Sequence, residues 1–231
     1  KKKKKYIKII SFNIKSCQEC NIDELIDYLK SKKVDVICLQ EVDLCSKYCP
    51  ENICELIEKK LGFEHKYLKT VNRKKGGSYG ISIFSKFPIL SYKEYYYNKY
   101  NEKRGMQEIE VFIPQFKRNI KIFNTHLDYK SNRNCQVEQC LEIISHNTDY
   151  DCMLCGDLNL NPSEEVYDLI SNKFKKIIYN NTYSSKRPTQ ILDYILLNKE
   201  SKLNYKYSVD NVKLSDHKPL ICKIKIVKSA I

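Results

Sequence analysis

The chain has 231 residues, which suits one domain with a substantial core. Apolar residues make up 42% of it, which excludes wholesale disorder, and no apolar run reaches the length of a membrane span. The net charge is +13, and the body keeps +8 without the five lysines at 1–5, so a polyanionic partner is one explanation and a lysine-rich solvated surface the other. We expect a disordered basic tail at 1–5 and a single domain over 6–231.

Strand and helix patterns alternate through the first third of the chain. The segments 6–13 and 34–39 are apolar and rich in β-branched residues, which predicts two buried strands. Apolar residues recur at helical spacing in 22–29 and again in 53–61, and Gly62 is a suitable end for the second helix. The strand–helix–strand order predicts a crossover unit with its helix on one face of a sheet.

The rest of the chain adds more strands than a single helix-covered sheet would hold. We predict a flexible basic loop at 70–79, a short strand at 81–84 and a tyrosine-rich loop from Tyr92 to Lys103, for which a strand is the alternative. Further strands are predicted at 106–113, 119–125, 152–155, 192–197 and 220–227, and helices at 132–145 and 163–170. Two stacked mixed β-sheets flanked by helices are the economical packing, which gives an α/β (α+β) fold.

Eleven cysteines are many for this length, and they fall into two kinds of context. One group lies in apolar strand-like runs and is expected to be buried and reduced: Cys38, Cys152, Cys155 and Cys222. The pairs Cys17-x-x-Cys20 and Cys45-x-x-x-Cys49 lie in polar loops after the first two strands, so they would meet if those strands are neighbours. A structural zinc, a disulfide and free thiols are the alternatives for this second group.

Acidic, amide and imidazole side chains end most of the predicted strands. They are Asn13, Glu41, His126, Asp157 with Asn159, Asp193, and Asp216 with His217. Asp157 and Asn159 are two positions apart, which places both side chains on one face of an extended segment. Carboxylates that gather inside a protein are costly unless a cation neutralises them, and a set without cysteine favours Mg²⁺ or Mn²⁺ over Zn²⁺. The pattern indicates a phosphoester hydrolase that uses a hard metal ion.

The same residues carry a resemblance that spans about residues 6–225. The motifs, in chain order, are Ser-Phe-Asn13, Leu-Gln-Glu41-Val-Asp, Ser-Tyr79-Gly80-Ile, Arg104-Gly, Thr-His126-Leu-Asp, Gly-Asp157-Leu-Asn159, Ile-Leu-Asp193-Tyr-Ile and Ser-Asp216-His217-x-Pro. Each motif is weak alone, but the ordered set resembles the endonuclease/exonuclease/phosphatase (DNase I-like) superfamily, and most of all its short single-domain metal-dependent hydrolases. The resemblance implies a four-layer sandwich, with two stacked β-sheets inside and helices outside, and an enzyme that requires Mg²⁺ or Mn²⁺.

The resemblance also implies roles for the residues that match. Glu41 is similar to the main metal ligand of the family, with Asn13 and Asp216 assisting it. Asp157 is similar to the base that orients and deprotonates the attacking water. Asn159 is similar to a donor that contacts the scissile phosphate.

The remaining matches lie around the imidazole and the substrate. His217, polarised by Asp193, is similar to the group that stabilises charge on phosphorus or shuttles a proton. His126 and Arg104 are similar to phosphate-facing groups, and Tyr79 belongs with Arg104 among the substrate-binding residues. A cationic neighbourhood would favour an ionised base, and Asp193 would raise the pKa of His217.

The substrate is left open between several phosphoesters. A histidine at position 126 resembles the pancreatic-type DNase, sphingomyelinase and phosphoinositide-phosphatase branches, and differs from the tyrosine-containing segment of the abasic endonucleases. Lys15 is a second difference, because the abasic endonucleases usually have an acidic residue there. The tyrosine-rich segment and the basic residues 73–75 would suit bases, a lipid headgroup or a second phosphate. A nuclease and a lipid phosphoesterase therefore stay as alternatives, and a non-catalytic polyanion-binding module with the same fold is the alternative from another class.

The expected partner is a phosphate-containing substrate, either nucleic acid or a phospholipid headgroup, bound by a monomer. The sequence opens with lysines in place of an apolar leader, which favours an intracellular protein, cytoplasmic or nuclear. A leader cleaved before residue 1 stays an open alternative.

Overall fold

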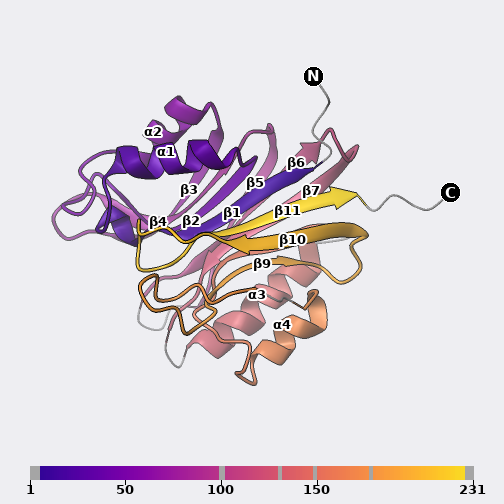
Figure 1. Ribbon diagram of the computed structural model, residues 1–231. Coiled ribbons are helices and arrows are strands. Elements are labelled where there is room, and N and C mark those ends of the chain that lie inside the picture. The colour runs from indigo at the N-terminus through magenta and orange to yellow at the C-terminus, as the bar shows by residue number, and fades with distance from the viewer. Residues whose placement is uncertain (1–5, 99–101, 130–131, 148–149, 177–178, 227–231) are drawn as a thin grey trace.

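The computed structural model describes residues 6–98, 102–129, 132–147, 150–176 and 179–226. The tail predicted at 1–5 lies outside these residues. Within them, no helix is long and apolar enough to cross a membrane. The chain folds into two stacked β-sheets with helices on both outer sides (Figure 1).

The first sheet contains strands from both ends of the chain. Its six strands run in the order β10 (Leu203–Val209), β11 (Leu220–Ile226), β1 (Ile7–Asn13), β2 (Val36–Leu44), β4 (Ser78–Ser85) and β3 (Glu64–Asn72). β1 and β2 are parallel, since the helix α1 (Ile22–Lys32) crosses back between them, and the other neighbours are antiparallel. The last strand, β11, therefore lies between β10 and the first strand of the chain.

The second sheet is built from one continuous part of the chain. Its five strands run in the order β5 (Ile89–Tyr96), β6 (Gly105–Ile113), β7 (Arg118–His126), β8 (Cys152–Asp157) and β9 (Asp193–Leu197). β7 and β8 are parallel and are joined by the helix α3 (Arg133–Asn147). Each sheet thus has one parallel pair, and the carboxyl ends of each pair carry the polar residues predicted above.

Four helices cover the two sheets from outside. α1 and α2 (Ile53–Leu61) lie against the first sheet, and α3 and α4 (Tyr167–Lys173) lie against the second (Figure 1). Asn21 and Glu24 form a capping box at the start of α1, and α2 ends at Gly62 in the left-handed conformation, as its sequence predicted. A short 3-10 turn, η1 (Lys15–Cys17), follows β1.

Three apolar layers hold this stack together. The central layer lies between the sheets and includes Ile9, Val36, Ile109, Ile122 and Met153, all fully buried. The two outer layers lie under α1 and α2 and under α3 and α4. Two sheets between two helical layers confirm the four-layer α/β sandwich.

Several segment predictions were wrong in detail. The predicted loop at 70–79 is shorter than expected, because β3 continues to Asn72 and β4 begins at Ser78, so only residues 73–77 form it. The tyrosine-rich segment forms the edge strand β5 up to Tyr96, so the alternative of a strand is correct there, and Tyr100 lies outside the described residues. Helix α4 begins at Tyr167, four residues after the predicted start. β3 and β10 were not predicted, because their partly exposed faces carry lysine, asparagine and tyrosine rather than an apolar run.

All eleven cysteines are free thiols in the structure. Cys38, Cys152, Cys155 and Cys222 are buried in strands, as predicted. The loops after β1 and β2 do meet, and the Cys17 thiol contacts those of Cys20 and Cys49. These thiols are reduced and pack against the apolar layer under α1 and α2.

Candidate active site

The polar ends of β1 and β2 form one side of the candidate site. β2 is bulged between Leu39 and Val42, and Glu41, within the bulge, has a left-handed backbone with φ 53°. The side-chain amide of Asn13 donates one hydrogen bond to Oε1 of Glu41 at 3.0 Å and another to Oδ2 of Asp157 at 3.0 Å. Since Asp157 belongs to the second sheet, the Asn13 amide joins the polar ends of both sheets.

A row of three residues across β7, β8 and β9 forms the other side. His126 is the register partner of Asp157, and Asp157 is the register partner of Asp193. The neighbouring residue Gly156 has φ 144°, and a Cβ there would lie 1.9 Å from the carbonyl oxygen of Thr125. Only glycine allows this close approach of β7 and β8, which fixes Asp157 beside His126.

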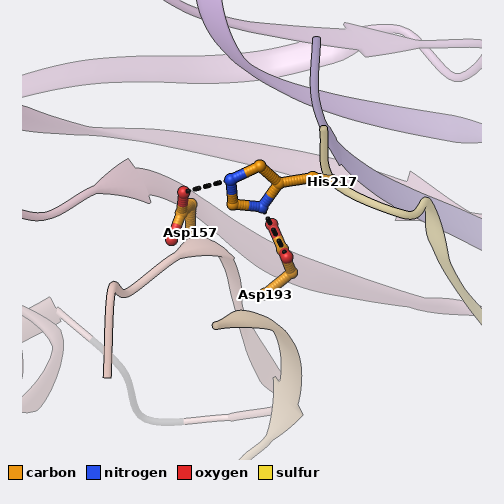
Figure 2. A group of neighbouring side chains, drawn as sticks. All are labelled: Asp157, Asp193 and His217. Atoms are coloured by element: carbon orange, nitrogen blue, oxygen red, sulfur yellow. Dashed lines mark hydrogen bonds and ion pairs between the residues drawn. The ribbon is translucent and has the colours of Figure 1, made fainter. Parts of the chain in front are cut away.

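His217 lies between the two aspartates of that row, as Figure 2 shows. Its Nδ1 is 2.9 Å from Oδ2 of Asp193, and its Nε2 is 3.6 Å from Oδ2 of Asp157. Tyr183 packs against the imidazole with ring centroids 4.8 Å apart. Asp193 is fully buried, and its backbone N–H is bound by the hydroxyl of Thr182, so the carboxylate that orients His217 is itself fixed.

The surroundings raise the pKa values of both Asp157 and His217, but for different reasons. Burial raises the pKa of Asp157 to about 7, although the charge of His217 opposes the rise. Burial alone would lower the pKa of His217, but the charges of Asp193 and Asp157 and the hydrogen bond that His217 donates to Asp193 raise it to about 10. The imidazole is therefore protonated at neutral pH, next to a carboxyl group that titrates there.

His126 differs from His217 in its protonation. Its Nε2 lies 3.5 Å from Oδ2 of Asp157 and 3.3 Å from the side-chain nitrogen of Asn159. Burial, with the charges of Arg104 and His217, holds the pKa of His126 well below its usual range. An amide nitrogen can only donate, so Nε2 accepts and the neutral ring carries its proton on Nδ1. Asn159, with φ 50°, also donates to the carbonyl oxygen of Leu127 at 2.9 Å.

Arg104 supplies a buried positive charge to the site. Its Nη2 donates to Glu102 at 3.0 Å, while Nε and Nη1 have no hydrogen-bond partner among the described residues. Burial acts to lower its pKa, but Tyr79, Glu102 and Glu41 raise it, so the guanidinium stays charged. A buried guanidinium with free donors is suited to an anionic oxygen of a ligand. Tyr79 is buried beside these charges but does not line the cleft.

Asp216 lies at the rim and is paired with a lysine. Lys15 Nζ is 3.2 Å from Oδ2 of Asp216 and 2.8 Å from Oε1 of Glu19. The hydrogen bond to Glu19 and the interactions with Asp216 raise the pKa of Lys15 to about 12, so this ammonium is permanently charged. The backbone N–H of Lys15 donates to the side-chain oxygen of Asn13, which turns that oxygen away from Glu41.

These groups share one cleft of 460 Å³. The predicted site residues that line it are Glu41, Arg104, His126, Asp157, Asn159, Asp216 and His217. Asn13 and Asp193 lie behind this wall and contact it through Asp157 and His217. All of the predicted catalytic and metal-site residues are thus gathered in or directly behind one cleft, while Tyr79 lies apart from it.

A slightly larger hollow of 540 Å³ lies at the other end of the second sheet, where β8 begins. Two of its charged residues, Arg118 and Asp151, are paired with each other at 2.8 Å. It shows no comparable convergence of acidic, amide and imidazole groups, so the cleft at the carboxyl ends of β7 and β8 is the better candidate.

The candidate site contains two groups of side chains that could coordinate a metal ion. Among the described residues, the tightest group of ligating atoms is Asp157, Asp193 and His217, whose atoms lie within 4.8 Å of one another. Both ring nitrogens of that histidine face carboxylates, which suits a charged hydrogen-bonded imidazole better than a metal ligand. The carboxylates of Glu41 and Asp216 face the same cleft with no cysteine among them, so the donor set fits a hard divalent ion.

The sequence interpretation missed seven residues of the cleft wall, and two of them, Arg133 and Tyr183, contact predicted site residues directly. Arg133, at the start of α3, donates through Nη1 to the carbonyl oxygen of Asn159 and through Nη2 to Glu164. Tyr183 covers His217 from a segment without regular structure. No sequence pattern marks Arg133 as a site residue, because it is a polar residue at the start of a helix. Tyr183 is one of eighteen tyrosines, and nothing in the sequence distinguishes it from the others.

Comparison with known proteins places this fold and site in a family. A model of the Endonuclease/Exonuclease/phosphatase family matches residues 10–217. The chain belongs to this family. Its members are phosphoester hydrolases, so the recognition made from the ordered motifs and the prediction of a phosphoesterase enzyme are both confirmed.

Solved structures agree on the fold at low sequence identity. A family protein from Leptotrichia buccalis is 19% identical, with a TM-score of 0.76 over 95% of this chain and 100% of that one. The mannosyl-6-phosphatase of Bacteroides thetaiotaomicron is 14% identical, with a TM-score of 0.74 over 94% and 99%. The human Nocturnin catalytic domain with bound sulfate is 20% identical, with a TM-score of 0.68 over 96% and 94%. No curated protein matches the chain by sequence.

Proposed function

We propose that this chain is a divalent-metal-dependent phosphoesterase that cleaves a phosphodiester or phosphomonoester by direct attack of water. The observation that carries the proposal is the position of Asp157, which lies 3.5 Å from one imidazole and 3.6 Å from another and is held by Asn13 from the opposite sheet. A carboxylate in that position can accept a proton from water in the cleft, with the protonated imidazole of His217 beside it.

Asp157 would act as the general base. Its backbone neighbour Asn159 donates to Oδ1 at 2.9 Å, so Oδ2 is the oxygen that faces Asn13 and the two histidines. Water bound there would transfer its proton to Oδ2 as its oxygen attacks phosphorus. A carboxyl group with a pKa near 7 is matched to this task at neutral pH.

His217 and Arg104 would stabilise the charge that develops on the phosphate. His217 is protonated, is oriented by Asp193 and presents Nε2–H to the cleft beside Asp157. Arg104 presents Nε and Nη1 from a buried position. Donors fixed in a buried site stabilise an anionic transition state without reorganising, so each is expected to contribute substantially to the rate. Asn159 and neutral His126 would complete the contacts to the phosphate oxygens.

A divalent ion fits the acidic side of the cleft. Glu41 would hold it, with Asp216 assisting, and Asn13 would fix the Glu41 carboxylate through its amide. The ion would supply a Lewis acid for the phosphate oxygens. Mg²⁺ or Mn²⁺ is proposed because the available donors are oxygens. The other polar residues keep their roles in binding phosphate and moving a proton at Asp157 and His217.

The substrate stays between two phosphoester classes. The structural relatives include a mannosyl-6-phosphatase, a TDP2 and a Nocturnin, so the shared fold alone does not select the substrate. A nuclease is proposed first, with a phosphoinositide or sphingomyelin phosphoesterase as the alternative, and the protein is proposed to act as an intracellular monomer. A non-catalytic polyanion-binding module is the remaining alternative.

One panel of assays tests the proposal. The purified protein is incubated with Mg²⁺ or Mn²⁺ and, in turn, with plasmid DNA, RNA oligomers, phosphoinositides, sphingomyelin and the chromogenic diester bis(p-nitrophenyl) phosphate. Metal-dependent release of product that is lost in Asp157→Asn supports the phosphoesterase. Absence of cleavage for every substrate with either metal would favour the binding module.

A further inference from the structure

A basic pocket lies beside the candidate active site, on the first sheet. It encloses 410 Å³ around the turn between β3 and β4 and the loop after β2. The residues that line it are Lys47, Tyr48, Val71, Asn72, Arg73, Lys74, Lys75 and Gly76. Four of these eight carry positive charge, and none carries negative charge, so the pocket is suited to an anion.

Arg73 forms the fixed floor of this pocket. Its Nε donates to Oδ1 of Asp43 at 2.8 Å and its Nη2 to Oδ2 at 2.5 Å. Its guanidinium lies 5.3 Å from the ring centroid of Tyr48 and 4.5 Å from that of Tyr79, so it packs against two aromatic rings. Asp43 balances only this one charge. Among the described residues, Lys47, Lys74 and Lys75 form no ion pair.

The pocket is connected to the candidate active site through two neighbouring elements. Asp43, which holds Arg73, lies on β2 two positions after Glu41, just beyond the bulge that contains Glu41. Tyr79, which packs on Arg73, is the register partner of Asp43, and its hydroxyl is close enough to Glu41 and Arg104 for their charges to act on it. Tyr79 therefore lies between Arg73 and the charges of Glu41 and Arg104, which places the pocket beside the candidate active site.

We propose that this pocket binds a neighbouring phosphate of a single-stranded nucleic acid whose scissile phosphate lies at Asp157 and His217. This inference rests on the proposed phosphoesterase function and names its substrate class. Lys47, Lys74 and Lys75 would contact the phosphate, and the ring of Tyr48, 42% exposed, would stack on the adjacent base.

The surroundings of Tyr48 favour a strand over a membrane surface. Tyr48 is the one exposed large apolar side chain that lines the pocket in the described part of the chain, and Lys47 Nζ lies 4.4 Å from its ring centroid. Insertion into a bilayer would need a broader apolar face. A lone aromatic ring among cations, at the edge of a concave pocket, matches the platforms that bind single strands without sequence preference.

Binding of a fluorescent twelve-residue oligothymidylate, followed by anisotropy across a range of salt concentrations, tests the proposal. Asp157→Asn with Mg²⁺ serves as the parent protein, so that affinity is measured without cleavage. Adding Lys74→Gln and Lys75→Gln should reduce the slope of log affinity against log salt by roughly 1.4, since each single-strand phosphate contact contributes about 0.7. Adding Tyr48→Ala should weaken binding by roughly 5- to 150-fold, the range for losing one base stack.

The matched control replaces two exposed lysines at the opposite edge of the first sheet, Lys202→Gln just before β10 with Lys225→Gln on β11, which removes the same charge outside the pocket. An equal loss of slope in control and pocket variants would overturn the proposal, and so would wild-type affinity for both pocket variants. Loss of binding to phosphatidylserine vesicles without loss of oligonucleotide binding would overturn it in favour of a lipid surface. The binding measurement does not depend on turnover. Failure of the proposed catalysis would be seen in a separate experiment, as a lack of cleavage by the unmodified protein.

Discussion

Nε2 of His217 lies 3.6 Å from Oδ2 of Asp157. The two side chains come from different sheets, since Asp157 ends β8 and His217 precedes β11. Burial raises the pKa of Asp157, whereas burial acts to lower the pKa of His217 and the charges of Asp193 and Asp157 raise it. In the proposed mechanism this pair handles the proton of the attacking water and the charge on the phosphate, and the first two predictions test that role.

Replacing Asp157 with asparagine should abolish most of the activity while leaving the fold intact. An amide of the same size cannot accept a proton at neutral pH, so kcat for a chromogenic diester with Mg²⁺ should fall at least about 10²-fold. Asp168→Asn, an exposed change on α4, is the matched control and should keep full activity. An Asp157→Asn protein with undiminished turnover would contradict the assignment of the base.

Replacing Asp193 with asparagine should shift the pH dependence of the reaction. Asp193, together with Asp157, raises the pKa of His217 to about 10, so the loss of Asp193 lowers that pKa and the imidazole loses its proton at a lower pH. The alkaline limb of the kcat profile should therefore move toward neutrality. A residue with only a structural role would lower kcat equally at every pH, and a parallel fall across the profile would count against the imidazolium role.

Arg133 should act as a positioning residue for the loop after β8. It donates to the carbonyl oxygen of Asn159 and to Glu164, and Glu164 in turn accepts from the backbone N–H of Asn161 at 2.9 Å. Arg133→Ala should lower kcat about 10-fold by loosening Asn159 and Asp157. Glu164→Gln combined with Arg133→Ala should cost less than the sum of the single changes, because both act through one network. Additive losses would separate the two residues.

The stability of the metal-free protein should fall as pH rises from about 4 to about 10. Asp157 and His217 have folded-state pKa values of about 7 and about 10, above their usual values of about 4 and about 6.5. The folded state therefore binds more protons than the unfolded state in this window. The free energy of unfolding falls as the pH rises and these protons are released. Urea midpoints measured in EDTA should show a shallower fall above about pH 6.5 in His217→Gln than in the exposed control His146→Gln. Identical pH profiles for the two variants would contradict the raised pKa.

Gly156→Ala should destabilise the protein by at least about 2 kcal/mol. The new Cβ would lie 1.9 Å from the carbonyl oxygen of Thr125, in addition to the strain of φ 144°. Gly62→Ala provides the control, because Gly62 also has a positive φ, 70°, but nothing within 4 Å of the added carbon. That variant should lose only about 1 kcal/mol. Equal unfolding free energies for the two variants would show that the close approach of β7 and β8 is not rigid.

The sequence predicted the site better than the edges of the fold. Glu41 and Asp157 were recognisable because each follows an apolar run that has to be a buried strand. β10 escaped prediction because one of its faces is exposed, so its polar residues alternate weakly with tyrosine. The contact between Arg133 and Asn159 was out of reach, because it joins a helix to a loop carbonyl that only the tertiary packing brings close. The ion pair of Lys15 with Asp216 was missed for the same reason.

β11 lies between β10 and β1, and Asp216 and His217 come immediately before it. A nascent chain therefore already contains Glu41 and Asp157 while the imidazole between Asp157 and Asp193 is still missing. The gap in the first sheet closes only after the ribosome has released β11. In the proposed mechanism, hydrolytic activity is therefore expected only once β11 has been synthesised and has paired with β1.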